Sequence, residues 1–166
     1  MGGNRAALAL IPLALLAALI VLGVGIPLAL STWRFRTVWR MLAPRYPPAD
    51  REVPLKPADQ VRKTYCEVHV AERTAASPGF TVEATPGGFA LVPGLWHRTL
   101  PPLWFPWAAI AECKLMTRTI GRLIVHCVRL RLADGDAWMQ VDSPAGERLY
   151  RFWFADTDRR HKTRAT

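Results

Sequence analysis

Cysteine and histidine are the side chains of this sequence best suited to metal chemistry, and two pairs of them lie close together. Cys66 and His69 are three residues apart, and His126 directly precedes Cys127. Both pairs fall in segments with strand-like alternation, where neighbours one or three positions apart point to opposite faces. Each pair would split its ligands, and the sequence lacks the C-x-x-C and H-x-x-x-H pairs of structural zinc sites. We expect no metal site and buried, unreactive cysteines.

The remaining polar residues form no catalytic motif. The three serines, Ser31, Ser77 and Ser143, lie outside any G-x-S-x-G sequence, and no phosphate-binding G-x-x-x-x-G-K-[ST] loop occurs. Asp134 and Asp136 bracket a predicted turn, where aspartate commonly makes local hydrogen bonds. We predict a protein that is not an enzyme and that has no catalytic, cofactor-binding or metal-binding residues.

The most distinctive segment is apolar, because residues 6–30 contain no charged, amide or hydroxyl side chain. As a helix this segment would measure roughly 37 Å, enough to cross a hydrocarbon core of about 30 Å. We predict a retained transmembrane helix. The alternative is a signal peptide that is cleaved at Ala29-Leu30-Ser31. However, this apolar region is longer than that of a typical signal peptide, which has about 7–15 residues.

Positive charge is unevenly distributed around this segment. Arg5 precedes it, and four arginines follow it before the first acidic residue: Arg34, Arg36, Arg40 and Arg45. Because loops rich in Lys and Arg stay in the cytoplasm, we predict an external N-terminus and a cytoplasmic C-terminal domain.

Residues 31–43 combine these arginines with aromatic rings, and six of them are predicted to lie at the membrane interface: Trp33, Arg34, Phe35, Arg36, Trp39 and Arg40. Rings at headgroup depth beside long cations are typical of an interface. Phe35, Trp39 and Leu42 belong to a stripe with helical spacing, so we expect a juxtamembrane helix along the surface. Alternatively, the stripe packs on the protein's own domain.

The net charge of +9 raises the question of nucleic-acid binding, but its distribution argues against it. Residues 47–158 contain 13 Lys or Arg and 13 Asp or Glu, so the excess lies at the two flanks. Basic flanks suit anionic lipid headgroups rather than a phosphate-binding domain. The run from Arg159 to Lys162 is alternatively a solvated tail.

Residues 44–60 contain five prolines and predict a semi-rigid linker between the membrane and the domain. Beyond it, alternation predicts strands over residues 64–70, 80–84, 89–92, 103–105, 113–117, 123–132 and 138–141. Ser143-Pro144 then predicts the start of a short helix that contains Leu149, although Gly146 leaves a further strand possible. Such short strands indicate an antiparallel sandwich or barrel. Three widely spaced cysteines argue against a disulfide framework and agree with a cytoplasmic location.

Residues 100–110 are unusually rich in proline and tryptophan. We expect Trp107 to plug the core from a single helical turn. Trp96 and Trp104 are candidate contact residues for a partner or for lipid, or else are part of the core.

Two of these motifs together carry a resemblance: Gly88-Phe89-Ala90-Leu91, and Pro101-Pro102-Leu103-Trp104-Phe105-Pro106-Trp107 followed by Ile110. The pattern resembles small bacterial membrane-anchored proteins with a pleckstrin-homology-like (PH-like, GRAM-type) domain. The resemblance implies a split barrel of about seven antiparallel strands with a short C-terminal helix, over residues 61–156, followed by a basic tail at 157–166. Such domains bind lipids or proteins. Recognition of inositol lipids does not carry over, because no basic strand-loop pocket is visible.

We therefore predict a single-pass protein of the bacterial inner membrane that presents a non-catalytic PH-like interaction or scaffold domain to the cytoplasm. Its partners would be the membrane, with anionic lipid near the basic flanks, and another protein, but no nucleic acid. The alternatives are a membrane-anchored accessory subunit of an enzyme and an anchored domain that faces the periplasm.

Overall fold

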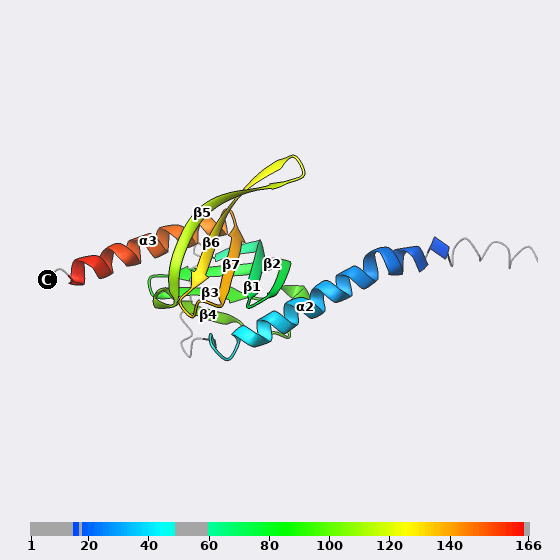
Figure 1. Cartoon of the computed structure of the whole chain (residues 1–166), viewed down its shortest axis with the longest axis horizontal. Helices are drawn as coiled ribbons and strands as arrows, with labels where there is room; N and C mark the ends of the chain where they lie inside the picture. The colour runs from blue at the N-terminus through cyan, green and yellow to red at the C-terminus, as the bar shows by residue number, and fades with distance from the viewer. Residues whose placement is uncertain (1–14, 17, 49–59, 165–166) are drawn as a thin grey trace, which may run out of the picture.

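The computed structural model describes residues 15–16, 18–48 and 60–164, which form a β-rich domain with a long helix leading away on either side (Figure 1). The N-terminal helix is π-helical over Val21–Gly25 and continues as α2 over Ile26–Leu42. The strands are β1 (Gln60–Val70), β2 (Arg73–Thr85), β3 (Gly88–Val92), β4 (Leu103–Pro106), β5 (Ile110–Ile120), β6 (Leu123–Leu132) and β7 (Ala137–Asp142). The 3-10 helices Leu95–His97 and Trp107–Ala109 flank β4, and α3 (Ala145–Arg164) follows β7.

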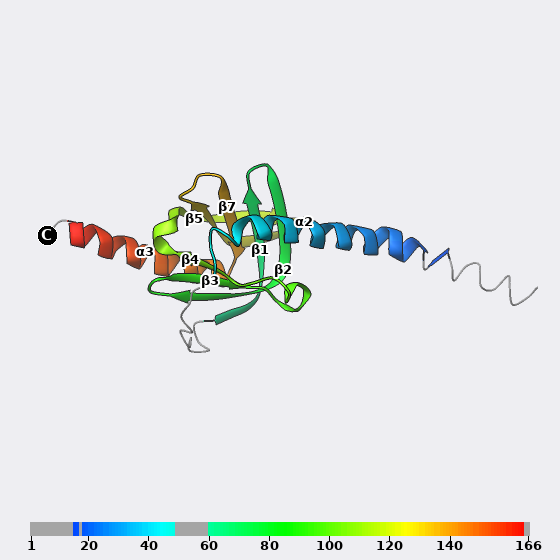
Figure 2. The same cartoon turned by 90° about the horizontal axis from the view of Figure 1, so that it is seen from below.

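The seven strands form one antiparallel sheet in the order β4-β3-β2-β1-β7-β6-β5. Two meanders, β1–β4 and β5–β7, are joined where β1 pairs with β7, with Cys66 opposite Val141 and Val70 opposite Ala137. The sheet curves so that both meanders face a common core (Figures 1 and 2). It remains open, because β4 and β5 are its two edges and are not paired with each other.

The predicted mainly-β architecture is confirmed at this level. Each of the predicted strand segments lies within an observed strand. In β1 the side chains of Cys66, Val68 and Val70 are buried, as the alternation of apolar residues predicted. A C-terminal helix follows the last strand, so the further strand considered there does not form.

Trp107 lies in the core, as predicted. Its side chain is 1% exposed, and its indole nitrogen donates a hydrogen bond of 2.9 Å to the carbonyl oxygen of Thr85. The ring packs between Phe89 of β3 and Phe152 of α3. Trp107 therefore joins the sheet to the helix that closes it.

The C-terminal helix is longer than predicted, because α3 has 20 residues and extends to Arg164. Residues expected to form a basic tail instead continue the helix, stabilised by ion pairs one turn apart such as Asp158–Lys162. Gly146 is buried in the first turn, where a Cβ atom would collide with the carbonyl oxygen of Val141. The glycine that weakened the prediction is thus required by close packing of α3 on the sheet.

The second half of α2 packs on the domain, and here the predicted membrane interface is partly wrong. Phe35 and Trp39 are each 1% exposed, and they lie in the same core cluster as Phe80. The indole nitrogen of Trp39 donates a hydrogen bond of 2.8 Å to the carbonyl oxygen of Pro101. The apolar stripe covers the domain rather than lipid headgroups, which is the alternative that the sequence left open.

The residues that directly follow α2 are docked on the domain. Arg45 forms an ion pair of 3.0 Å with Asp134 in the β6–β7 turn, and the hydroxyl of Tyr46 donates to the same carboxylate. The first residues of the predicted linker are therefore fastened to the domain. Residues 49–59 of the predicted linker lie outside the described residues, as do residues 1–14 and 17 of the predicted anchor.

Candidate functional site

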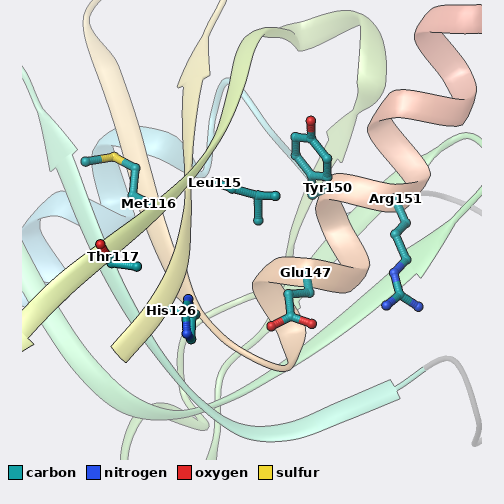
Figure 3. Close-up of a pocket in the computed structure, with 7 residues that line it drawn as sticks. All are labelled: Leu115, Met116, Thr117, His126, Glu147, Tyr150 and Arg151. Carbon is teal, nitrogen blue, oxygen red and sulfur yellow. The ribbon is translucent and has the colours of Figure 1, made fainter. Parts of the chain in front are cut away.

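A groove of about 540 Å³ lies between the β5–β6 hairpin and the first turns of α3 (Figure 3). Its lining comes from three elements: Leu115, Met116 and Thr117 from β5, His126 from β6, and Glu147, Tyr150 and Arg151 from α3. In Figure 3 Glu147 lies between His126 and Arg151 along the groove. The groove therefore offers apolar surface together with acidic, basic and imidazole groups.

The strand register places one face of the hairpin in this groove. Leu115 is opposite Val128 and Thr117 is opposite His126, so these four side chains share one face of the β5–β6 ladder. On α3 the groove residues follow the spacing i, i+3, i+4 from Glu147, which puts them on one side of the helix. The close approach at Gly146 holds that side of the helix near the sheet.

The outer edge of β5 is open along the groove. β5 is the last strand of the sheet, so among the described residues only β6 pairs with it. The two-residue turn after Ile120 leaves Ile120 and Leu123 directly opposite each other, and residues that flank such a turn form a hydrogen-bonded pair. Because hydrogen-bonded and non-hydrogen-bonded pairs alternate, the N–H and C=O groups of Leu115 and Thr117 point outward.

The other edge of the sheet is partly covered. The backbone N–H of Trp104 in β4 donates a hydrogen bond of 3.3 Å to the carbonyl oxygen of Tyr46, just after α2. The predicted contact residue Trp104 is half-buried on this edge, where its ring lies against Gly88, and it is absent from the groove lining. Trp96, the other candidate, lies in the 3-10 helix Leu95–His97, and its side chain is outside the description.

The charged groups around the groove leave Arg151 as a cation that a ligand can pair with. Glu147 accepts a hydrogen bond of 2.9 Å from the hydroxyl of Ser143. Arg151 is exposed, and in the described ranges no ion pair of 4.0 Å or less involves its guanidinium group. A ligand that lay along the groove would therefore meet an unneutralised positive charge on α3.

A second charged cluster lies on the outer face of the sheet, and no motif in the sequence predicted it. The guanidinium group of Arg118 in β5 lies 2.7 Å from the carboxylate of Asp142 and 3.6 Å from that of Glu67. It also lies over the ring of Tyr65, 4.5 Å from the ring centroid. These contacts brace the hairpin against β1 and β7, which is a structural role.

The predicted separation of Cys66 from His69 is confirmed. Cys66 is completely buried, whereas His69 stacks on Trp138 on the outer face of the sheet. Burial raises the pKa of the Cys66 thiol, and it raises that of Cys113 to about 12. Within residues 15–16, 18–48 and 60–164 no three His, Cys, Asp or Glu side chains form a group that could hold a metal ion.

The predicted interface residues occupy two environments. Trp33, Arg34 and Arg40 are exposed, whereas Arg36 is half-buried beside the docked aromatic rings. A cleft of about 450 Å³ separates Trp33 and Arg34 from the β1–β2 turn at Glu72. The helix stays beside β2 beyond this cleft, because Pro27, Leu30 and Ser31 line a second cleft with Thr74, Ala75 and Ala76.

One helix near the N-terminus, Ala18–Leu42, is long and apolar enough to cross a membrane. In its first half the side chains of Leu19, Leu22 and Leu30 are exposed and lie outside the core. The two halves of the helix thus differ in their partners: the second half packs on the domain, and the first half leads away from it (Figure 1).

None of the groove residues was predicted as a site. The alternation of β5 and the helical spacing of α3 were each readable, but their meeting depends on tertiary packing. Comparison with protein-family models, with curated proteins and with solved structures finds no match to this chain.

Proposed function

We propose that this protein is a single-pass membrane protein whose PH-like domain binds an extended segment of another protein at the cytoplasmic face of the inner membrane. The domain acts as an interaction module and not as an enzyme. Two antiparallel meanders joined through β1 and β7, with a helix after the last strand, support the PH-like assignment. The apolar half of the N-terminal helix supports the anchor.

The observation that carries the binding role is the open edge of β5 beside α3. An extended peptide can extend a sheet by pairing with the outward N–H and C=O groups of an edge strand. Here those groups belong to Leu115 and Thr117, and alternate side chains of the added segment would enter the groove. Unprotected edge strands otherwise favour aggregation, so a partner on β5 also gives this edge a purpose.

The groove chemistry specifies the segment that would fit. Leu115 and Tyr150 offer apolar contacts, whereas Arg151 offers a cation on the α3 side. We expect an extended segment with one apolar side chain facing Leu115 and an acidic side chain within reach of Arg151. A charged pair at this exposed site would contribute mainly to specificity and to the association rate.

The docked helix supports a fixed placement of this groove. Because Phe35 and Trp39 are buried against the domain, only a short length of helix separates the core from the apolar half. The exposed Arg34 and Arg40 flank that boundary and suit anionic headgroups on the cytoplasmic side. The basic end of α3 leads to the opposite side of the molecule, so it suits a solvated surface (Figure 1).

Photo-cross-linking in the intact membrane tests the binding edge. A photoreactive amino acid at Thr117 should form a discrete adduct with one protein, whereas the same amino acid at Thr99, an exposed position outside the groove, should not. A second adduct from Leu115 to the same protein would establish that the contact follows the strand edge.

A matched pair of substitutions tests strand addition itself, with the photoreactive group at Leu115. Thr117→Pro removes an outward donor without removing one from the β5–β6 ladder, and Thr117→Ala retains the donor. We expect the adduct to be lost in the first variant and retained in the second. Equal amounts of adduct in the two variants would contradict strand addition. The proposal would also be contradicted if the otherwise unaltered protein formed no adduct from position 115 or from position 117.

A further inference from the structure

The tip of the β5–β6 hairpin is an exposed apolar surface that the proposed partner site does not use. Ile120 is 50% exposed, and Leu123 and Ile124 are each 70% exposed. Ile120 and Leu123 face each other across the turn, and Ile124 points to the other face of the ribbon. The tip is therefore apolar on both faces.

This tip stands clear of the rest of the sheet. β7 pairs with β6 from Cys127 to Arg131, and the carbonyl oxygen of His126 accepts a further hydrogen bond from the N–H of Ser143, so the ladder pairs Leu123–Val125 with β5 alone. Figure 1 shows the hairpin as a ribbon that projects beyond β7. Gly121 has a positive φ of 60°, which allows the tight turn that ends the ribbon.

The hairpin is braced at its base, so its direction is defined. Arg118 contacts Asp142 and Glu67 at 2.7 and 3.6 Å, which ties β5 to β7 and β1 where the free part of the ribbon begins. In Figure 1 the free part rises toward the upper right and the apolar half of the N-terminal helix leads to the right, whereas α3 leads to the left. The helix and the tip therefore approach the same side of the domain.

The chemistry of the tip suits the boundary between headgroups and acyl chains. Arg122, in the turn itself, is exposed and lies next to Leu123. A long cation beside exposed aliphatic side chains can place its charge among anionic headgroups while its neighbours enter the acyl region. Large exposed apolar side chains grouped in this way mark an interaction site, and the anchored helix provides a bilayer within reach.

We propose that the tip of the β5–β6 hairpin, residues Ile120–Ile124, inserts into the same bilayer that the N-terminal helix spans. This inference rests on the proposed membrane anchor. Two separate contacts with one bilayer would fix the rotation of the domain about α2, which one helix alone does not fix. The groove along β5 would then face a constant direction relative to the membrane surface.

Depth-dependent quenching tests this insertion in the full chain. The protein carries an environment-sensitive fluorophore on Leu123→Cys and is reconstituted in vesicles of phosphatidylcholine and phosphatidylglycerol. The three native cysteines are buried, and burial raises the pKa of each thiol, so they react slowly with the label. Nitroxide on headgroups or upper acyl positions should remove more than about half of the fluorescence, since interfacial segments lie at that depth.

Two matched positions make the outcomes distinguishable. Phe154→Cys, at an exposed aromatic residue of α3, should be unaffected by any lipid nitroxide, and Leu22→Cys in the apolar half-helix should be quenched by deep nitroxide. Quenching at Leu22 without quenching at Leu123 would overturn the inserted tip and leave the anchor intact. Absence of quenching at Leu22 would overturn the anchor and the inference together.

A second variant excludes insertion caused by the label. With the fluorophore on Thr119→Cys, the changes Leu123→Gln and Ile124→Gln should together reduce quenching if the tip itself inserts. Unchanged quenching would mean that the label carries the tip into lipid, which overturns the proposal. The fluorophore at position 123 could instead show blue-shifted emission in detergent and no quenching by lipid nitroxide in vesicles. That result would mean that protein covers the tip, and it would also overturn the proposal.

Discussion

The ring of Phe35 in α2 stacks on the ring of His97, in the 3-10 helix before β4, with the two centroids 4.7 Å apart. The Nε2 atom of His97 lies 2.8 Å from the hydroxyl of Ser77 in β2, so His97 links the helix to the sheet. Through this contact the orientation of the N-terminal helix is coupled to the core of the domain.

The first prediction follows from that coupling. Phe35→Ala should lower the free energy of unfolding of the detergent-solubilised protein by about 3–5 kcal/mol, because it removes a buried ring and leaves a cavity. Urea unfolding followed by tryptophan fluorescence measures the change. Trp33→Ala is the matched control, since Trp33 is an aromatic residue of the same helix that is 64% exposed. Equal losses in both variants would contradict docking of this helix face.

A second prediction concerns the pH dependence of stability. Burial, and next the nearby charge of Arg36, lower the pKa of His97 below its ordinary value of 6.5. At pH values between 6.5 and the lowered pKa, His97 binds a proton in the unfolded chain but not in the folded protein. The free energy of unfolding should therefore fall as the pH drops below about 6.5, where an unfolded histidine begins to titrate.

Substitution identifies the part of this dependence that belongs to His97. His97→Gln should flatten the decline in unfolding free energy below neutral pH, whereas His126→Gln, at an exposed histidine of the groove, should leave the decline as it is. Urea titrations at a series of pH values between neutral and mildly acidic give both curves. An unchanged slope in His97→Gln would show that the imidazole does not resist protonation in the folded state.

The third prediction sets helix propensity against packing at Gly146. Alanine favours a helix over glycine by about 1 kcal/mol. However, a Cβ atom here would collide with the carbonyl oxygen of Val141 and crowd the backbone of Val128. We expect Gly146→Ala to destabilise the protein by about 1–3 kcal/mol, because overpacking outweighs propensity. Gly87→Ala, which meets open space, should change stability by less than about 0.5 kcal/mol in the same urea unfolding assay.

The strands were predictable because each is a local pattern. Alternation along β1 and β6 and the turn at Asp134-Gly135 depend only on neighbouring residues, and the burial of Val68 and Leu130 follows from them. The core position of Trp107 was predictable for a related reason: proline on its N-terminal side fixes the backbone path into a single helical turn.

The docking of α2 and the groove were not predictable in the same way. An apolar stripe containing Phe35 and Trp39 suits either lipid or a protein surface, and only the position of Phe80 and His97 in the folded domain decides between them. The groove residues Thr117 and Arg151 are 34 positions apart in the sequence and meet only because α3 packs beside the edge strand.

The last prediction concerns the direction in which the anchor is inserted. A fluorescent protein that matures only in the cytoplasm should be active when fused after Thr166, and periplasmic alkaline phosphatase at the same position should be inactive. Arg34→Gln and Arg40→Gln together should weaken this orientation, since both side chains are exposed and their loss lowers the positive charge that follows the helix. Arg45 is left unchanged, because its ion pair with Asp134 holds the helix to the domain. High phosphatase activity from the unaltered chain would reverse the predicted topology and place the β5 edge in the periplasm.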